Sequence, residues 1–232
     1  MPTHATCRVG RFAAAALLLA ATLAACSTDN TTATGTPTPT AVGMLGGSAQ
    51  IAPIGSPLAV PLLVHVTDQY GNAIAGATVS FAGTGGVTVA STTVTTDPSG
   101  NAQTTATLGT RAGPDTVLAT IAGAPTAVRF LETAIPGAAA SITVVSGNGQ
   151  TGTTGVPLSL PLVVVIQDQA GNTIVGDSVS WTATAGAVSA PTSYSTIGGS
   201  TQVIFTPALG GNTVTATVSG TALAATLTET GN

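Results

Sequence analysis

Few side chains of this protein could carry out catalysis. The 232 residues include two histidines, His4 and His65, and two cysteines, Cys7 and Cys26. A nucleophilic triad needs a histidine to move a proton, and a hydrolytic zinc site usually needs one as a ligand. His65 is the only histidine beyond the first 25 residues, and it lies in an alternating apolar segment. We therefore interpret it as a partly exposed strand residue and predict that the protein is not an enzyme.

The acidic residues are the other candidates for chemistry. A glycosidase would need two carboxyl groups that converge in a cleft, whereas an aspartate in a turn bonds the local backbone. Five aspartates follow the first 40 residues, and their neighbours are mostly turn-like: Asp68, Asp97, Asp115, Asp168 and Asp177. Calcium, which takes six or more oxygen ligands, is an alternative at a domain junction. Because no Asp-rich run is present, we predict turn formers, with no metal site and no cofactor.

Cys26 follows a segment typical of a secretory signal peptide. Arg8 and Arg11 precede an apolar run from residue 12 to 25, which is too short for a stable transmembrane helix. The ending Leu-Ala-Ala-Cys at 23–26 resembles the bacterial lipobox, in which the cysteine after the cleavage site receives a diacylglycerol thioether. The resemblance implies a signal peptide at 1–25 and a lipid on Cys26. The alternative is an ordinary signal peptide with a cysteine near its cleavage site.

Residues 26–42 predict a tether between the lipid and the folded part. The stretch from 27 to 40 is rich in Thr and Pro and has no apolar periodicity, so we expect a disordered linker. Its 14 residues would span roughly 40 Å if extended. Ser27, rather than Asp, follows the cysteine, which under the sorting rule of enteric bacteria resembles a signal for the outer membrane. The expected location is the cell envelope, with the protein lipid-anchored at the outer membrane or cell surface.

The composition favours an all-β protein and excludes some partners. Hydrophobic residues make up 44% of the chain and charged residues only 5%, a balance that argues against a disordered polar tail. Thr, Val, Gly and Ser dominate, whereas strong helix formers such as Lys and Glu are nearly absent. Beyond residue 25 two arginines face eight acidic residues, a formal net charge of −6 without any lysine. Nucleic acid is therefore an unlikely partner, because its binding depends on clustered basic residues.

An internal repeat predicts two domains. Asp-Gln-Tyr-Gly-Asn at 68–72 recurs as Asp-Gln-Ala-Gly-Asn at 168–172, an offset of 100 residues, and the offset falls to 97 near the repeat ends. A period this long is typical of tandem domains rather than of a solenoid. We place domain 1 at 43–135 and domain 2 at 136–232.

Within each repeat, apolar residues alternate as in half-buried strands. One face of the first such strand is predicted to contain Val60, Leu62, Val64 and Val66, matched by Leu160, Leu162, Val164 and Ile166. The Asp-Gln-x-Gly-Asn motif then provides a turn. Phe81 and Trp181 occupy the same core-facing position of the following strand. About seven strands per repeat predict two immunoglobulin-like β-sandwiches.

The order of these motifs resembles the bacterial Ig-like domains of the invasin and intimin type. The motifs are Val-x-Val-x-Asp-x-x-Gly-Asn followed by Val-x-Phe or Val-x-Trp, the Thr-Asp-x-x-Gly turn at 96–100, and a closing Ala-Thr-x-x-Gly. The second repeat differs from the pattern at 197–199, where Ile-Gly-Gly replaces the Asp turn. The resemblance implies a rigid rod of bacterial surface proteins without catalytic machinery.

These features predict a non-enzymatic, membrane-anchored surface protein whose Ig-like rod serves adhesion, envelope structure or presentation of a partner. The alternative is a polysaccharide-binding lipoprotein that uses loops such as 83–96, and a hydrolase is the third hypothesis. The expected partners are the membrane, through the lipid, and an unidentified protein or glycan. Tyr70, which lies in a turn and is replaced by Ala170, is the aromatic residue best placed to contact a ligand.

Overall fold

The computed structural model describes residues 37–232, and every regular element in them is a β-strand. The predicted all-β class is therefore confirmed. The predicted signal peptide, Cys26 and most of the predicted linker lie outside the described residues. Between residues 37 and 232 there is no helix long and apolar enough to cross a membrane.

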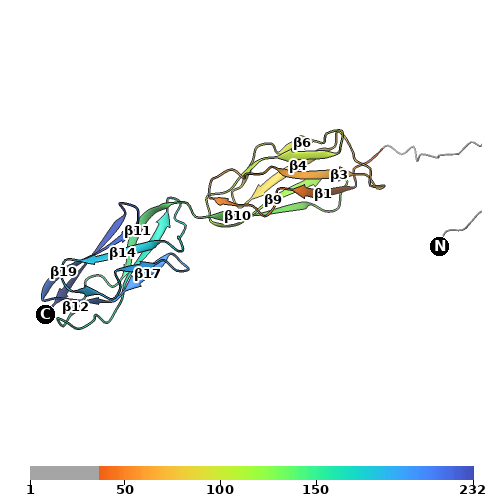
Figure 1. The fold of residues 1–232 in the computed structure, drawn as a ribbon. Helices are drawn as coiled ribbons and strands as arrows, with labels where there is room; N and C mark the ends of the chain where they lie inside the picture. The colour runs from red at the N-terminus through yellow and green to blue at the C-terminus, as the bar shows by residue number, and fades with distance from the viewer. Residues whose placement is uncertain (1–36) are drawn as a thin grey trace, which may run out of the picture. The chain divides into compact units, whose positions relative to one another are not determined.

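The first ten strands form one sandwich, called domain 1 below (Figure 1). A three-stranded sheet has the order β1-β3-β7, a five-stranded sheet has the order β2-β10-β9-β4-β6, and β5 pairs with β8. The strands are β1 (Ala41–Gly46), β2 (Ile51–Pro53), β3 (Leu62–Thr67), β4 (Thr78–Thr84), β5 (Thr88–Val89), β6 (Thr93–Thr95), β7 (Asn101–Thr104), β8 (Ala106–Thr107), β9 (Gly113–Ile121) and β10 (Val128–Ile135).

The next ten strands repeat this topology in domain 2, with sheets β11-β13-β17 and β12-β20-β19-β14-β16 and the pair β15-β18. The strands are β11 (Ala139–Ser146), β12 (Thr151–Gly152), β13 (Leu162–Asp168), β14 (Ser178–Ala183), β15 (Ala187–Val188), β16 (Thr192–Tyr194), β17 (Ser200–Val203), β18 (Phe205–Thr206), β19 (Gly210–Val218) and β20 (Ala224–Gly231). The sequence repeat is thus a repeat of the whole strand order. The count of ten exceeds the expected seven because several segments of two or three residues pair as separate strands.

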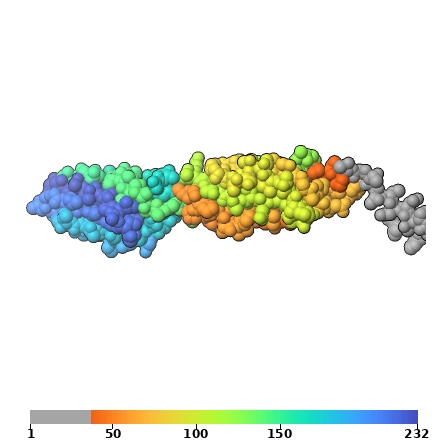
Figure 2. Space-filling view, turned by 90° about the horizontal axis from the view of Figure 1, so that it is seen from above, coloured from red at the N-terminus to blue at the C-terminus, as the bar shows by residue number. Residues whose placement is uncertain are grey.

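Each domain has its own hydrophobic core, built from alternate residues of its two sheets. Leu62, Val64 and Val66 of β3 are fully buried, as are their counterparts in β13. Phe81 and Trp181 are each 2% exposed, so their predicted place in the core is confirmed. Burying a side chain of this size contributes about 1.5–3 kcal/mol. Figure 2 shows the surface of the described residues from one side, coloured along the chain.

The prediction that Val60 and Leu160 belong to the same buried series is wrong, because they are 52% and 54% exposed. Each precedes a proline, and β3 and β13 begin only after it. The side chain of Gln50 binds the backbone of Val60 on both sides, accepting from its N–H at 2.8 Å and donating to its carbonyl at 2.9 Å. Gln150 binds Leu160 in the same way. The alternation of buried and exposed side chains therefore begins with the strand itself and not with the two residues before it, the second of which is proline.

Candidate functional site

The structure gives His65 a neutral partner. The ring Nδ1 lies 3.0 Å from Oδ1 of Asn101, across the β3–β7 pair. That oxygen belongs to an amide and carries no charge. The contact fits the interpretation of His65 as a strand residue.

Asp68 and Asp168 organise the repeated turns. Oδ1 of Asp68 accepts hydrogen bonds from the backbone N–H of Tyr70 at 2.9 Å and of Asn72 at 2.8 Å. Asp168 accepts from Ala170 and Asn172 with the same geometry. Burial raises the pKa of both carboxyl groups, but the hydrogen bonds outweigh it, so that each pKa is below its usual value. Both carboxylates bind the backbone of their own turn, as the sequence predicted, and Asp168 also accepts from the backbone N–H of Gly137 at 3.0 Å.

The remaining predicted aspartates do not form a cluster. Asp97 accepts from the backbone N–H groups of Ser99 and Asn101, and Asp115 accepts from that of Gly109. Within the described part of the chain, no group of three or more His, Cys, Asp or Glu side chains could hold a metal ion. The turn Tyr70 is 66% exposed, and its role as a ligand contact stays a prediction.

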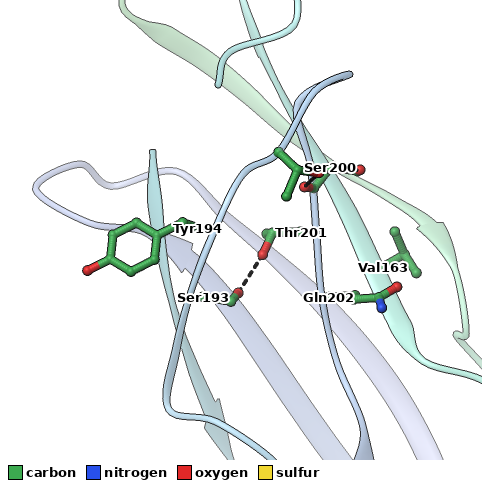
Figure 3. A pocket seen from close by; sticks show the side chains of 7 residues that line it. Val163, Ser193, Tyr194, Ser200, Thr201 and Gln202 are labelled. Carbon is green, nitrogen blue, oxygen red and sulfur yellow. Dashed lines mark hydrogen bonds between the residues drawn. The ribbon is translucent and has the colours of Figure 1, made fainter. Parts of the chain in front are cut away.

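A hollow in domain 2 brings together polar side chains that the sequence analysis did not select. We call it the β16–β17 hollow, and it has a volume of about 390 Å³. It lies where the edge strands of the two sheets, β16 and β17, approach each other (Figure 3). Its lining residues are Val163, Ser193, Tyr194, Thr196, Ser200, Thr201 and Gln202. None of them is charged at neutral pH, and five carry a hydroxyl group.

A hydrogen-bond network connects this hollow to the core. The indole N–H of Trp181 donates to Oγ of Ser193 at 2.7 Å, and Oγ1 of Thr201 donates to the same oxygen at 2.6 Å. Figure 3 shows the hydroxyl groups of Ser193 and Thr201 facing each other, with Tyr194 on one side and Val163 and Gln202 on the other. A buried indole N–H needs an acceptor, and Ser193 provides it.

Domain 1 has a hollow at the equivalent place, but its floor is apolar. Register fixes the correspondence, because Val94 and Ser193 pair with Val79 and Val179, while Ala102 and Thr201 pair with Val64 and Val164. This hollow has about 450 Å³ and is lined by Leu63, Val94, Thr95, Asp97, Asn101, Ala102 and Gln103. The set Phe81, Val94 and Ala102 of domain 1 is thus replaced in domain 2 by Trp181, Ser193 and Thr201.

Two buried glutamates, which the sequence analysis also missed, have a structural role. Glu132 and Glu229 are each 2% exposed, and one oxygen of each accepts from the backbone N–H of Gln50 or Gln150 at 2.7 Å. The other carboxylate oxygen has no hydrogen-bond partner among the described residues. Burial raises the pKa of both glutamates above the usual value, although the backbone hydrogen bonds act in the opposite direction. Each glutamate thereby binds the segment that follows the first strand of its domain to the five-stranded sheet.

Comparison with known families supports the fold. Residues 58–131 match the family model of the bacterial Ig-like domain, group 1. Among curated proteins no match was found. The match covers most of domain 1. The resemblance to bacterial Ig-like domains is therefore confirmed for domain 1, and domain 2 repeats its strand topology.

The solved structure of InvD shares this fold. InvD of Yersinia pseudotuberculosis is 20% identical, with a TM-score of 0.53 over 82% of this chain and 57% of that chain. The Escherichia coli adhesin FdeC is 22% identical, with a TM-score of 0.49 over 85% of this chain and 66% of that chain. The D0-D1 domain of intimin is 18% identical, with a TM-score of 0.33 over 83% of this chain and 98% of that chain. The chain thus spans less than two thirds of InvD and FdeC, and at 20% identity the likeness to InvD establishes the fold alone.

Proposed function

We propose that this protein is a non-enzymatic surface protein of the bacterial cell envelope, anchored through a lipid on Cys26, whose Ig-like domains serve adhesion, envelope structure or presentation of a partner. The observation that supports this best is the duplicated Ig-like sandwich, of the fold seen in InvD, behind a leader that ends in Leu-Ala-Ala-Cys. FdeC is described as an adhesin and invasin as an integrin-binding protein. An outer-membrane or cell-surface location is consistent with these descriptions of FdeC and invasin.

The proposed anchor is physically sufficient for durable attachment. Each acyl CH₂ group that enters the bilayer contributes about 0.8 kcal/mol, and stable anchoring needs more than one chain. The diacylglycerol of a lipoprotein meets that requirement. The Thr/Pro-rich residues 26–42 would hold the Ig-like domains clear of the lipid headgroups.

The non-enzymatic part of the proposal is supported by the partners of the reactive groups. The carboxylates of Asp68, Asp97 and Asp168 accept hydrogen bonds from their own turns, and His65 contacts an amide oxygen. These groups are engaged within the fold, which supports a structural role for them.

The anchor is tested by replacing the cysteine. In cells of a Gram-negative host, Cys26→Ser should move the protein from the detergent-soluble membrane fraction to the soluble fraction and abolish acyl modification by mass spectrometry. Cys7→Ser is the matched control, since it lies inside the predicted leader and should leave the protein in the membrane. If the Cys26→Ser protein stays in the membrane fraction, the lipid anchor is refuted.

The location is tested on intact cells. Antibody against the Ig-like domains should label unbroken cells, and externally added protease should degrade the protein. Labelling that appears only after the outer membrane is permeabilised would contradict a surface position and leave an envelope role on the inner side.

A further inference from the structure

We propose that the β16–β17 hollow of domain 2 is a binding site for a neutral carbohydrate. The inference rests on the proposed surface role, for which it names the class of ligand. It does not depend on the lipid, so the two can fail separately.

The first argument is a count of hydrogen-bond donors. The indole N–H of Trp181 is taken up by Ser193, and the contact between Ser193 and Thr201 uses one of their two hydroxyl hydrogens. A hydroxyl group has one hydrogen to donate and two lone pairs. Whichever of the two donates to the other, one O–H remains without a protein acceptor in the described part of the chain. Both residues line the hollow, so this donor is available to a ligand oxygen there.

The second argument is that the fold itself does not require a polar floor, since Ser193 is needed as an acceptor only because tryptophan stands where domain 1 has Phe81. Domain 1 packs the equivalent position with Phe81, Val94 and Ala102, and its core is as fully buried as that of domain 2. Exchanging apolar groups for hydroxyl groups at a buried position costs free energy unless they are hydrogen-bonded. Thr201 is only 5% exposed. The network of domain 2 satisfies most of its members and leaves one hydroxyl donor on residues that line the hollow, where it is available to a ligand oxygen.

The third argument concerns the chemistry of the remaining lining. Tyr194 is 65% exposed at one side of the hollow and offers an aromatic surface, while Thr196, Ser200 and Gln202 offer hydroxyl and amide groups that both donate and accept. A sugar presents apolar C–H faces and hydroxyl groups that both donate and accept, which matches this combination. Because the lining has no charged group, an acidic or a basic ligand would lose solvation without gaining a counter-charge. The match is therefore to a neutral sugar.

The equivalent hollow of domain 1 lacks these properties. Its carboxylate, Asp97, is occupied by the N–H groups of Ser99 and Asn101, and Oδ1 of Asn101 contacts His65. Thr95 stands in the place of Tyr194. Asp97 and Asn101 of domain 1 are thus engaged within the protein, and the aromatic surface is missing.

The test uses the full chain, purified in detergent, and a panel of neutral hexasaccharides derived from glucan, mannan and galactan. Oligomers of polygalacturonate and of chitosan serve as the acidic and basic counterparts. Trp181 is the only tryptophan, so its fluorescence reports on the floor of the hollow. We expect saturable binding of at least one neutral oligosaccharide, with a change in this fluorescence. The charged oligomers should bind more weakly, by about tenfold or more.

Variants then locate the site. The triple change Trp181→Phe, Ser193→Val and Thr201→Ala installs the set that domain 1 already packs, and it should weaken binding, measured by calorimetry, by about tenfold or more. Tyr194→Ala, an exposed change that should leave the melting temperature unaltered, should weaken it similarly. Thr95→Ala, at the exposed position of domain 1 that is equivalent to Tyr194, should have no effect.

Three results would overturn the inference. They are the absence of binding to every neutral oligosaccharide at millimolar concentration, preferred binding of a charged oligomer, and binding that both Tyr194→Ala and the triple variant leave unchanged. Should the triple variant fail to fold, Tyr194→Ala decides alone. Loss of sugar binding with intact membrane attachment would reject this site and keep the proposed anchor, whereas release of the protein by detergent-free washing would reject the anchor and keep the site.

Discussion

Domains 1 and 2 share their backbone contacts and differ in the residues beneath one hollow. Both have the Asp turn at 68 or 168, the glutamine at 50 or 150 that binds the approach to the central strand, and the buried glutamate at 132 or 229. Each of these satisfies backbone N–H or C=O groups that would otherwise be unpaired. The comparison teaches that the duplicated framework is maintained by backbone hydrogen bonding, while the side chains at the sheet edges are free to diverge.

The divergence is coupled across three strands. A tryptophan replaces phenylalanine on β14, and the serine and threonine that complete its network lie on β16 and β17, in different sheets. A second difference lies opposite the buried glutamates, where Asp115 faces Glu132 and Asn212 faces Glu229. Asn212 forms hydrogen bonds to the backbone of Ala208 and Gly210, which closes that loop in domain 2.

The largest expected effect tests whether the aromatic position is equally important in both domains. Trp181→Ala should destabilise domain 2 by about 3–5 kcal/mol, and Phe81→Ala should destabilise domain 1 by a similar amount, because each removes a buried ring. Urea denaturation followed by circular dichroism measures both. An unchanged urea midpoint in either variant would show that its aromatic residue does not stabilise the core.

A smaller effect separates the two aromatic environments. Ser193→Val should destabilise domain 2 by about 1–3 kcal/mol, because it leaves the indole N–H of Trp181 without its acceptor. Adding Trp181→Phe should recover much of this loss, since the pair then matches Phe81 and Val94. The double-mutant cycle gives the coupling free energy directly. If the effects of the two changes on the free energy of unfolding are additive, Trp181 and Ser193 do not interact energetically.

The smallest expected effect concerns pH and the shared glutamates. The pKa of Glu132 and of Glu229 is raised in the folded chain, so the unfolded chain loses these protons at lower pH than the folded chain does. Their contribution to stability is full below the ordinary glutamate value and is lost as pH rises through the raised pKa. In the double variant Glu132→Gln, Glu229→Gln, the free energy of unfolding should therefore fall less as pH rises through the raised pKa.

The turn aspartates give the opposite slope and act as the control. The pKa of Asp68 and of Asp168 is lowered by folding, so their contribution is present above the ordinary aspartate value and is lost as pH falls through the lowered pKa. The double glutamate variant should keep this loss in acid. Denaturant midpoints across the two pH ranges measure both slopes, and an unaltered decline above the ordinary glutamate value would contradict the assignment to Glu132 and Glu229.

The sequence predicted the elements that depend on local pattern. Alternation located β3 and β13, and the offset of the repeat paired Phe81 with Trp181 at the core. The prediction failed at Val60 and Leu160. The apolar alternation in the sequence continues through the proline that follows each of them, whereas the strand begins only after that proline. The edge strands of two or three residues were too short to show any period.

The β16–β17 hollow could not be predicted from pattern alone, because it depends on contacts between strands of different sheets. One signal was present. With the repeats aligned, serine replaces Val94, threonine replaces Ala102 and tryptophan replaces Phe81, which is a joint change from apolar to hydrogen-bonding groups. Only the register shows that these three positions meet.

The number of sugar molecules bound per chain tests most directly the central claim that domain 2, and not domain 1, has the binding site. Isothermal titration of the full chain with the neutral hexasaccharide that binds best should give one site per chain. A stoichiometry of two would show that the apolar hollow of domain 1 binds equally well, and it would contradict the importance of the network formed by Trp181, Ser193 and Thr201.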